Sequence, residues 1–600
     1  MQIPCSARCQ SAKAAQTGPR PYANPSSRRG LSNSPFLIPG LKFFTDPESN
    51  SRPGNLFSEK LHSDYHNNPE TRYHIPFAPI GDPGNRRLKV ITIEAGLAGV
   101  ILAYNIEKHC PNVEHVIYEK NPTVGGTWYQ NRYPNAACDS PTCTYQFNFA
   151  IDPEWEKFLS GSDYLRQYVA KVVKKLDLEK YMTFNSRVIE ARFDDKKGIW
   201  DVKIEQTASD ESKKTFTGDC DLLLGAVGIL DRWEYPKIPG LESFKGQVIH
   251  SADRTKWKQY TKDKWANDEI AVIGSGASAY QVVPGMQPYA KRVHSFLRTP
   301  AWFFAQMSSF GGDPRPQDYT SDRWCLEPDT EEEKSLFRKD HGAMLKHAKA
   351  NESVLMMLQH MMVKHGPAYH QARKTLTERT RKWIKDDDLF EKLIPSWSPG
   401  CHRITPGDPF MVAIQEPNVD VHLTGVSRVD ENGVFGDDGT YTACVLPNSL
   451  PLDRVGRLRP SQRVAYRPSE LYGCLLEAIV GYTVKVIKKM QRDNIKYFVP
   501  RQDATDEFND HAQSWFKGTV WEENCNAWYK NRKTGRVDAI WPGSALHFRD
   551  AIEDPRWEDM EIKYHSYLGY GFAPVDLSTS SEADRSPYLK LENLDPRFYE

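Results

Sequence analysis

The sequence predicts an α/β protein with two dinucleotide-binding (Rossmann-like) domains, the first interrupted by the second. Two observations support this fold class. A glycine turn between a short apolar strand and a helix occurs twice, at residues 94–99 and 274–279. The chain of 600 residues is also too long for a single hydrophobic core. We therefore expect a first domain on both sides of an inserted second domain, which also carries a helical subdomain.

The second glycine turn, within residues 269–300, has the more complete pattern. Gly274 makes the tight turn, Gly276 lets a pyrophosphate approach the backbone, and Ala279 allows the helix to pack closely on the strand. The next strand ends at Arg298 instead of the acid that usually binds a ribose. An arginine there favours a 2′-phosphate, and therefore NADPH over NADH. The alternative is a purely structural turn.

The first glycine turn follows an apolar run in residues 89–99. Glu119 lies twenty residues after Gly99, where an acid can accept the ribose hydroxyls. An acid in the first site and an arginine in the second indicate FAD followed by NADPH. The small positions of this turn are occupied by Glu94, Gly96 and Gly99. Glu94 opposes pyrophosphate binding through its bulk and its charge.

The composition is compatible with a cytoplasmic protein that binds no nucleic acid and has no membrane span. Basic and acidic residues number 78 each, so bulk charge favours neither nucleic acid nor an anionic membrane. Mean hydropathy is −0.63, and no apolar run reaches the roughly 18 residues of a membrane span. The 11 cysteines are scattered without paired motifs, which argues against a disulfide framework or a zinc site. His360, His365 and His370 do not share one helical face, so we expect no metal site there.

We divide the chain into four parts. Residues 1–72 form an arm rich in Ser, Pro and Asn, with no acid before Asp46; it is a targeting segment, a disordered tail or the product of a wrongly assigned start. Residues 73–232 form the first part of the FAD domain, and residues 233–400 the NADP domain with its helical insert. Residues 401–600 form the second part of the FAD domain, with an atypical stretch at 441–483.

Several elements follow from periodicity and composition. An antiparallel pair of strands, a buried strand and one helix are expected in the first part of the FAD domain, and further helices are expected in the later parts. In order, these are a helix at 165–176, strands at 187–193, 198–204 and 221–228, a mostly helical region at 321–393, and a helix over 484–490.

Six motifs together resemble the flavin-dependent Baeyer–Villiger monooxygenases, and more closely their fungal relatives in polyketide and terpenoid pathways. The resemblance extends from about residue 73 to residue 564, with one break. The motifs are GGTWYQNRYP at 125–134, CD at 138–139, FKGQVIH at 244–250, RTP at 298–300, PGCHRITPGD at 399–408 and WPGS at 541–544.

The resemblance implies two sets of cofactor-binding residues. Together with the small residues Gly96 and Gly99 of the first turn, the FAD set is Glu119, Thr127, Trp128, Tyr129, Gln130, Asp139 and Tyr145. The NADP set is Ala137, Cys138, Asp139, Gly274, Ser275, Gly276, Ala277, Ser278, Ala279, Tyr280, Arg298 and Thr299.

Arg403 matches the family's arginine that stabilises the anion formed when oxygen adds to the flavin. A permanently charged guanidinium suits an anion in a dry pocket, and a carboxylate such as Asp139 can orient it. Both are expected to be catalytic. Without the family, Arg403 could be a surface arginine and Asp139 a loop cap.

Four departures from the family pattern keep alternatives open. They are Glu94, Asn135 in place of a glycine, Arg254 in place of an aromatic residue, and residues 441–483, which lack strand periodicity. The first hypothesis is an FAD- and NADPH-dependent monooxygenase that inserts an atom of O2 beside a ketone of a small organic substrate. The second is a flavin monooxygenase that hydroxylates nitrogen, sulfur or carbon. The third is a catalytically impaired remnant of such an enzyme.

Overall fold

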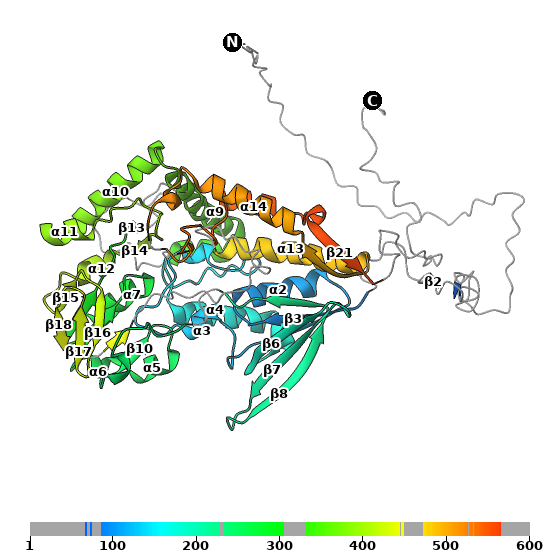
Figure 1. Cartoon of the computed structure of the whole chain (residues 1–600), viewed down its shortest axis with the longest axis horizontal. Helices are drawn as coiled ribbons and strands as arrows, with labels where there is room; N and C mark the ends of the chain where they lie inside the picture. The colour runs from blue at the N-terminus through cyan, green and yellow to red at the C-terminus, as the bar shows by residue number, and fades with distance from the viewer. Residues whose placement is uncertain are drawn as a thin grey trace, which may run out of the picture.

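The computed structural model describes most of the chain (Figure 1). Its described residues are 67–68, 73–74, 86–228, 233–304, 331–443, 446–448, 472–525, 527–531 and 533–565. The predicted N-terminal arm therefore lies outside the described residues, apart from β1 (Asn67–Asn68), which pairs with β2 (Tyr73–His74). Much of the atypical stretch at 441–483 also lies outside them.

The first nucleotide turn belongs to a four-stranded parallel sheet in the order β5-β4-β3-β9. The strands are β3 (Leu88–Ile93), β4 (Val113–Tyr118), β5 (Met182–Thr183) and β9 (Leu222–Gly225). Helices α2 (Leu97–His109) and α4 (Ser162–Lys175) contribute side chains to the same core. The strands and the helix predicted here are confirmed, although the last strand is shorter than residues 221–228.

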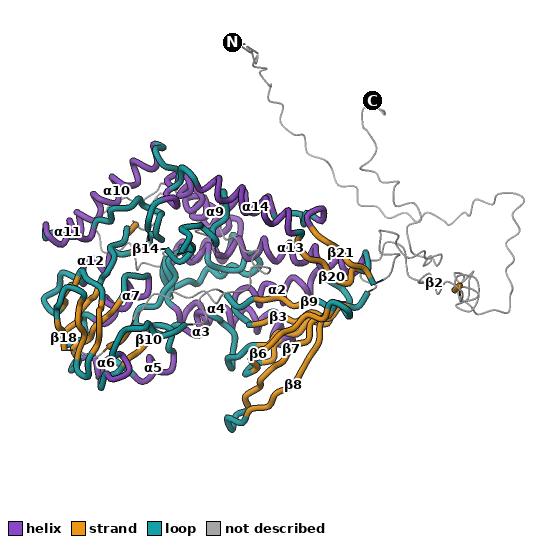
Figure 2. Tube along the Cα trace, in the orientation of Figure 1, coloured by secondary structure: helices purple, strands orange, loops and turns teal. Residues whose placement is uncertain are grey.

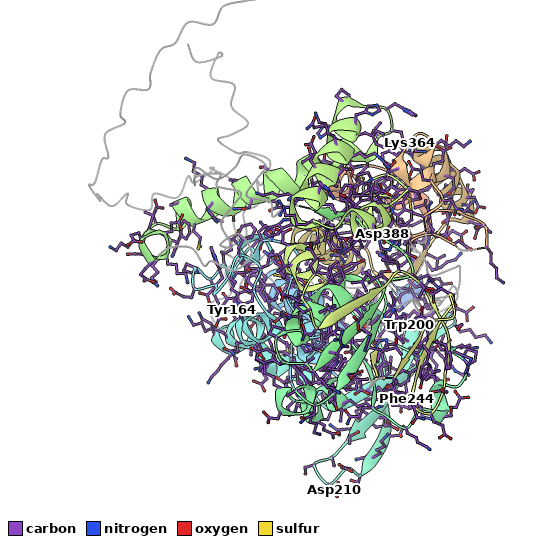
Figure 3. All side chains as sticks on the ribbon, turned by 90° about the vertical axis from the view of Figure 1, so that its left-hand side faces the viewer. Tyr164, Trp200, Asp210, Phe244, Lys364 and Asp388 are labelled. Atoms are coloured by element: carbon purple, nitrogen blue, oxygen red, sulfur yellow. A yellow bond between two sulfur atoms is a disulfide. The ribbon has the colours of Figure 1, made fainter. Side chains whose placement is uncertain are left out.

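An antiparallel sheet projects from this first unit (Figure 2). It consists of β6 (Ser186–Asp194), β7 (Ile199–Thr207) and β8 (Lys213–Cys220). In the side-chain view, Asp210 marks the far tip of the β7–β8 hairpin (Figure 3). The predicted antiparallel pair is confirmed, and β8 adds a third strand that the sequence analysis does not predict.

The second nucleotide turn lies in a different parallel sheet, in the order β11-β12-β15. Its strands are β11 (Glu269–Ile273), β12 (Arg292–Phe296) and β15 (Val419–His422). Neighbouring elements are β10 (Val248–His250), which pairs with β19 (Leu446–Asn448), and the antiparallel set β16 (Val426–Val429), β17 (Gly433–Gly436) and β18 (Tyr441–Ala443).

The pairing of β12 with β15 places residues beyond 400 in the second unit, so the boundary predicted between the NADP domain and the second part of the FAD domain lies further along the chain. β15 is hydrogen-bonded to β12, and Phe410 and Met411 of α12 (Asp408–Ala413) are buried in the core around Val272. The unit that begins near residue 233 therefore continues beyond residue 400, at least as far as His422. The order of the two glycine turns, with flavin-type sequence on both sides, predicts this segment in the FAD domain, and the strand pairing moves it to the second unit.

The helical region between β12 and α12 contains α8 (Glu331–Lys339), α9 (His341–Met357), α10 (Pro367–Trp383) and α11 (Asp387–Leu393). Its predicted helical character is confirmed within the described residues. No group of three or more His, Cys, Asp or Glu side chains in the described part of the chain could hold a metal ion.

The chain returns to the first unit through α13 (Tyr472–Arg492). Val480, Val484, Ile487 and Met490 recur at helical spacing and pack in one core with Leu88 and α2. Burying such a side chain contributes about 1.5–3 kcal/mol relative to leaving it exposed. The helix predicted over 484–490 is confirmed, and it begins within the stretch that sequence analysis treats as atypical.

Other elements complete the described chain. They are α3 (Thr127–Gln130), α5 (Arg254–Gln259), α6 (Lys262–Trp265), α7 (Ala277–Met286), β13 (Phe303–Phe304), β14 (Thr405–Pro406), β20 (Ile495–Pro500), α14 (Gln502–Phe516), α15 (Ala545–Ala551) and β21 (Met560–Tyr564). None of the described helices is both long and apolar enough to span a lipid bilayer.

Candidate functional site

The first glycine turn brings backbone segments unusually close together. A Cβ at Gly99 would lie 2.3 Å from the carbonyl oxygen of Glu94, and one at Gly126 would lie 2.8 Å from the Cα of Gly96. Both positions therefore require glycine. Gly96 is the N-cap of α2 and provides no side-chain cap, so the amide groups of the first helical turn are suited to an anion.

Glu94 is the exception in this turn. Its φ of 78° lies in the left-handed region, where a Cβ strains the backbone. The corresponding residue of the second turn, Gly274, has a φ of 130° and carries no Cβ. The Glu94 carboxylate lies 3.7 Å from the ammonium of Lys120, and its side chain is only 15% exposed. Lys120 therefore offsets part of the charge, while the strain of the backbone remains.

Glu119 ties the end of β4 to the glycine turn. Its fully buried carboxylate accepts hydrogen bonds from the amide of Ala95 (2.7 Å), and from the amide and side chain of Asn121 (2.8 and 2.6 Å). A carboxylate offers about four acceptor sites. The three bonds fix the orientation of this one and leave capacity for a further donor, such as a ribose hydroxyl.

A polar pocket of about 380 Å³ opens beside the end of β4. Its lining brings four cationic side chains together with one carboxylate, which suits an anionic or strongly polar ligand. The cationic residues are Lys120, Arg187, Lys213 and Arg254, the acid is Glu205, and the others are Asn121, Tyr129, Gln130, Asn185, Thr207 and Thr255.

Four of the predicted FAD-binding residues form the single-turn helix α3, directly after Gly126. Trp128 is buried and meets the Tyr145 ring edge-on, with the ring centroids 5.6 Å apart. The Trp128 Nε1 has no hydrogen-bond partner among the described residues. A buried N–H donor of this kind is expected where a polar ligand completes the site.

These observations test whether the site fits FAD. The glycine contacts, the open start of α2, the oriented Glu119 carboxylate and the orphaned Trp128 donor all fit a bound pyrophosphate and ribose. Glu94 is the one residue that opposes it, through strain and residual charge. The residues present therefore fit the cofactor, with a weakened turn.

The second glycine turn has no such defect. The Gly274 amide donates to the carbonyl of Phe296, and Ala279 is fully buried between helix and strand. Gly276 caps α7 without a side-chain hydrogen bond, as Gly96 does for α2. The Tyr280 hydroxyl donates to the Ser275 carbonyl at 2.8 Å, which braces the turn from within. Ser275 lies in the turn and Ala277 and Ser278 in the first turn of α7, where backbone amides are suited to a phosphate.

Arg298 and Thr299 lie directly after β12, at the carboxyl end of the sheet. Arg298 is exposed, and no ion pair joins it to another side chain in the described ranges. Its guanidinium is therefore available to a phosphate. Ligands of open α/β sheets bind at this edge of the strands.

Arg403 and Asp139 form an ion pair, with 2.7 Å between Nη2 and Oδ2. Asp139 comes from the loop after α3, and Arg403 from the segment before β14. Their side chains are 20% and 34% exposed, respectively. The backbone amide of the neighbouring Cys138 donates a hydrogen bond to the carbonyl oxygen of Ser160. Burial raises the pKa of the Cys138 thiol to about 12, so the thiol stays neutral beside the ion pair.

Tyr133 and Gln281 are absent from the predicted site residues. The Tyr133 hydroxyl donates to the Gln281 side-chain oxygen at 3.0 Å, and burial raises the Tyr133 pKa to about 12. The hydroxyl therefore stays protonated near Asp139 and Arg403. The position of Tyr133 in the Arg-Tyr-Pro motif was the available signal, whereas no local pattern marks Gln281.

Arg254, in the unit with the second glycine turn, stacks on Tyr129 in the unit with the first glycine turn. Its guanidinium carbon lies 4.0 Å from the centre of the Tyr129 ring, a distance typical of a cation–π contact. Beside it, the Gln130 side chain donates to the Ala252 carbonyl at 3.0 Å. A planar guanidinium thus occupies the interdomain position where the resemblance places an aromatic ring.

A disulfide between Cys401 and Cys525 anchors the Arg403 segment to the C-terminal region. The Glu523 carboxylate supports the same contact by accepting from the amide and hydroxyl of Ser398, at 2.7 and 2.6 Å. The scattered cysteines do not predict this pair, since the two residues are 124 positions apart. Cys110, Cys138, Cys143 and Cys220 are buried and belong to no disulfide bond.

We expect reduction of this disulfide to lower the melting temperature of the protein. Cross-links that close long loops typically contribute about 2–4 kcal/mol to the free energy of unfolding. Thermal melts with and without a phosphine reductant measure the effect. A Cys401→Ser/Cys525→Ser double variant serves as the control, because it should melt early and no longer respond to the reductant. Equal melting of the wild type in both buffers would contradict the expectation.

Comparison with known proteins gives the same picture as the geometry. The model of the flavin-binding monooxygenase-like family matches residues 88–319. A crystal structure of OTEMO in complex with FAD and NADP superposes with a TM-score of 0.64 at 20% identity, covering 79% of this chain and 99% of that one. The predicted fold class is confirmed by this likeness.

Relatives of known name cover between 78% and 90% of the chain. A Baeyer–Villiger monooxygenase of Streptomyces coelicolor is 28% identical over 78% of this chain and 91% of its own length. The FAD-binding monooxygenase stcW of Emericella nidulans is 37% identical, covering 88% and 93% of the two chains. The FAD-binding monooxygenase moxY of Dothistroma septosporum is 39% identical, covering 90% and 91%. The resemblance noted from the motifs is thereby confirmed, and this chain belongs to the family of FAD-binding monooxygenases.

Proposed function

We propose that this protein is an FAD- and NADPH-dependent monooxygenase of the Baeyer–Villiger type. It inserts one oxygen atom of O2 next to the ketone carbonyl of a secondary metabolite, a polyketide or a terpenoid, in a fungal biosynthetic pathway. The observation that carries the proposal is the ion pair between Arg403 and Asp139 at 2.7 Å. A cation held by a carboxylate is suited to stabilise negative charge on oxygen.

FAD, once bound and reduced by NADPH, supplies the oxygen chemistry of the reaction. The chain itself contributes binding and electrostatics. Gly96, Gly99 and the start of α2 would hold the FAD pyrophosphate, and Glu119 would accept hydrogen bonds from its ribose. The turn at 274–279 would hold the pyrophosphate of NADPH at the start of α7.

Arg403 contributes a charge that does not depend on pH in the working range, because a guanidinium stays protonated. Asp139 fixes its orientation before the reaction begins, so no reorganisation is needed when negative charge develops. Tyr133 remains a neutral hydrogen-bond donor at this place. The three side chains thus favour an anion over a neutral oxygen species, as attack on a ketone carbonyl requires.

A test of this proposal uses the purified flavoprotein with NADPH, 18O2 and a panel of cyclic and open-chain ketones. We expect esters or lactones that carry one labelled oxygen atom. Hydroxylated amines or sulfoxidised thioethers without ester formation would favour a heteroatom-hydroxylating monooxygenase instead. A protein that takes up no FAD and reduces none would favour an impaired remnant.

We expect Arg298→Ala to weaken NADPH binding about tenfold or more, since a charge-assisted hydrogen bond contributes about 1.5–3 kcal/mol. NADH use should stay nearly unchanged, because NADH lacks the 2′-phosphate that Arg298 is proposed to contact. Steady-state kinetics with both cofactors measure the effect. Arg292→Ala is a matched control, because Arg292 opens the same strand but is paired with Asp420. Equal use of NADPH and NADH by the wild type would contradict this assignment.

A further inference from the structure

Gln281, on the second turn of α7, is hydrogen-bonded to the segment of residues 133–139, which ends at Asp139. Its side-chain oxygen accepts from the Tyr133 hydroxyl at 3.0 Å and from the Ala137 amide at 3.3 Å. Its side-chain nitrogen donates to the Ala137 carbonyl at 3.1 Å. One amide group therefore satisfies both backbone groups of Ala137 and an adjacent buried hydroxyl.

The helix and the segment are also packed directly against each other. A Cβ at Gly285 would lie 2.7 Å from the Pro134 Cβ and 3.1 Å from the Asn135 side chain. The Ser278 side chain, at the start of α7, partly offsets the effect of burial on the Tyr133 pKa. The segment thus follows α7 from the glycine turn to a point two helical turns further on.

The C-terminal end of this segment contacts Arg403 directly. Ala137 pairs with Gly161 in an isolated β-bridge, and the Cys138 amide donates to the Ser160 carbonyl at 3.1 Å. The next residue, Asp139, holds Arg403. Ala137 is therefore separated from Asp139, the residue that holds Arg403, by Cys138 alone.

We propose that Gln281 is a positioning residue that couples dinucleotide binding at the 274–279 turn to the orientation of Asp139 and, through it, of Arg403. Gln281 lies two residues after the turn, on the helix that the turn begins, so a ligand that orders the start of α7 also orders the Gln281 side chain. The inference rests on the proposed roles of Asp139 and Arg403. Only a side chain with both a donor and an acceptor can satisfy Ala137 in this way.

The test combines Gln281→Leu with a matched control on the same helix. Gln287→Leu removes a glutamine of equal size at the end of α7, whose side chain donates to Asn418 instead of the segment. Hydrogen exchange of the peptide covering residues 133–140 is followed in the full-length flavoprotein, with and without saturating NADP+. NADP+ affinity and the fraction of NADPH turned into oxygenated product are measured in the same samples.

In the wild type and in Gln287→Leu, we expect NADP+ to slow exchange of the Ala137 and Cys138 amides. In Gln281→Leu, exchange should be about tenfold faster, the change that one lost net hydrogen bond produces, and NADP+ should no longer slow it although it still binds. The fraction of NADPH that yields product should fall, with hydrogen peroxide formed instead. A purely structural role would accelerate exchange but leave the response to NADP+ intact.

The inference is overturned if Gln281→Leu retains NADP+-dependent protection of residues 133–140. Should this variant fail to fold, Tyr133→Phe removes only one of the hydrogen bonds and should weaken the response to NADP+ in the same direction; an unchanged response there also overturns the inference. The exchange measurement does not depend on the substrate, whereas the ketone assay of the wild type tests the proposed function by itself.

Discussion

Replacing Arg403 by alanine is expected to abolish oxygenation while leaving the reduction of FAD by NADPH intact. The Arg403 guanidinium is held 2.7 Å from Asp139 and is assigned to the charge that develops on oxygen. It has no assigned role in hydride transfer. Losing a preorganised partner for a developing anion typically costs about 100-fold or more in rate.

Two measurements separate the half-reactions of Arg403→Ala. Anaerobic stopped-flow absorbance at the flavin band reports reduction by NADPH, and product analysis under oxygen reports oxygenation. Arg403→Lys retains the charge but not the planar fork, and should recover part of the activity. Asp139→Asn retains the size of the partner but not its charge, and should reduce oxygenation less than the loss of Arg403. Normal oxygenation by Arg403→Ala would show that the assignment is wrong.

Replacing Glu94 by glycine is expected to strengthen FAD binding about tenfold or more. Two effects act in the same direction. A left-handed φ costs a residue with a Cβ about 1–2 kcal/mol, which glycine avoids. A carboxylate about 4 Å from a phosphate charge, at an effective dielectric near 20, costs roughly 4 kcal/mol before screening. The ion pair with Lys120 reduces this second effect without removing it.

Titration of the apoprotein with FAD compares the wild type with Glu94→Gly. Glu94→Gln provides the control, because it removes the charge but keeps the Cβ in the left-handed conformation. An intermediate affinity for Glu94→Gln assigns the difference to both charge and backbone strain. Equal, tight binding of FAD by all three proteins would mean that the turn accommodates Glu94 and that the first site is not weakened.

The sequence predicted correctly those elements whose structure depends on neighbouring residues alone. The strand, turn and helix around Gly274 follow from glycine conformation and apolar periodicity, and the structure places them as expected. The same holds for β3, β4 and the α2 turn. The helix over residues 484–490 was also predictable, because its apolar residues recur at helical spacing.

Contacts between distant segments were not predictable in the same way. No pattern in the sequence specifies that Cys525 bonds to Cys401, or that α7 supplies Gln281 to residues 133–137. β15 was placed in the wrong unit because four residues carry too little periodicity to reveal their partner strand. The pairing of Asp139 with Arg403 was suggested by the resemblance to a family, and neither residue's neighbours in sequence indicate it.

The packing of α13 on α2 has a consequence for the synthesis of the chain. Gln491 donates to the carbonyl of Arg86 across 405 residues, and the apolar face of α2 finds its partner in α13. At 5–20 residues per second, a ribosome needs on the order of 20–80 s to bridge this interval. During that time the nascent first unit exposes the apolar surface that α13 later covers. We expect it to be the part of the newborn protein that chaperones bind, and a chain interrupted before residue 472 to aggregate.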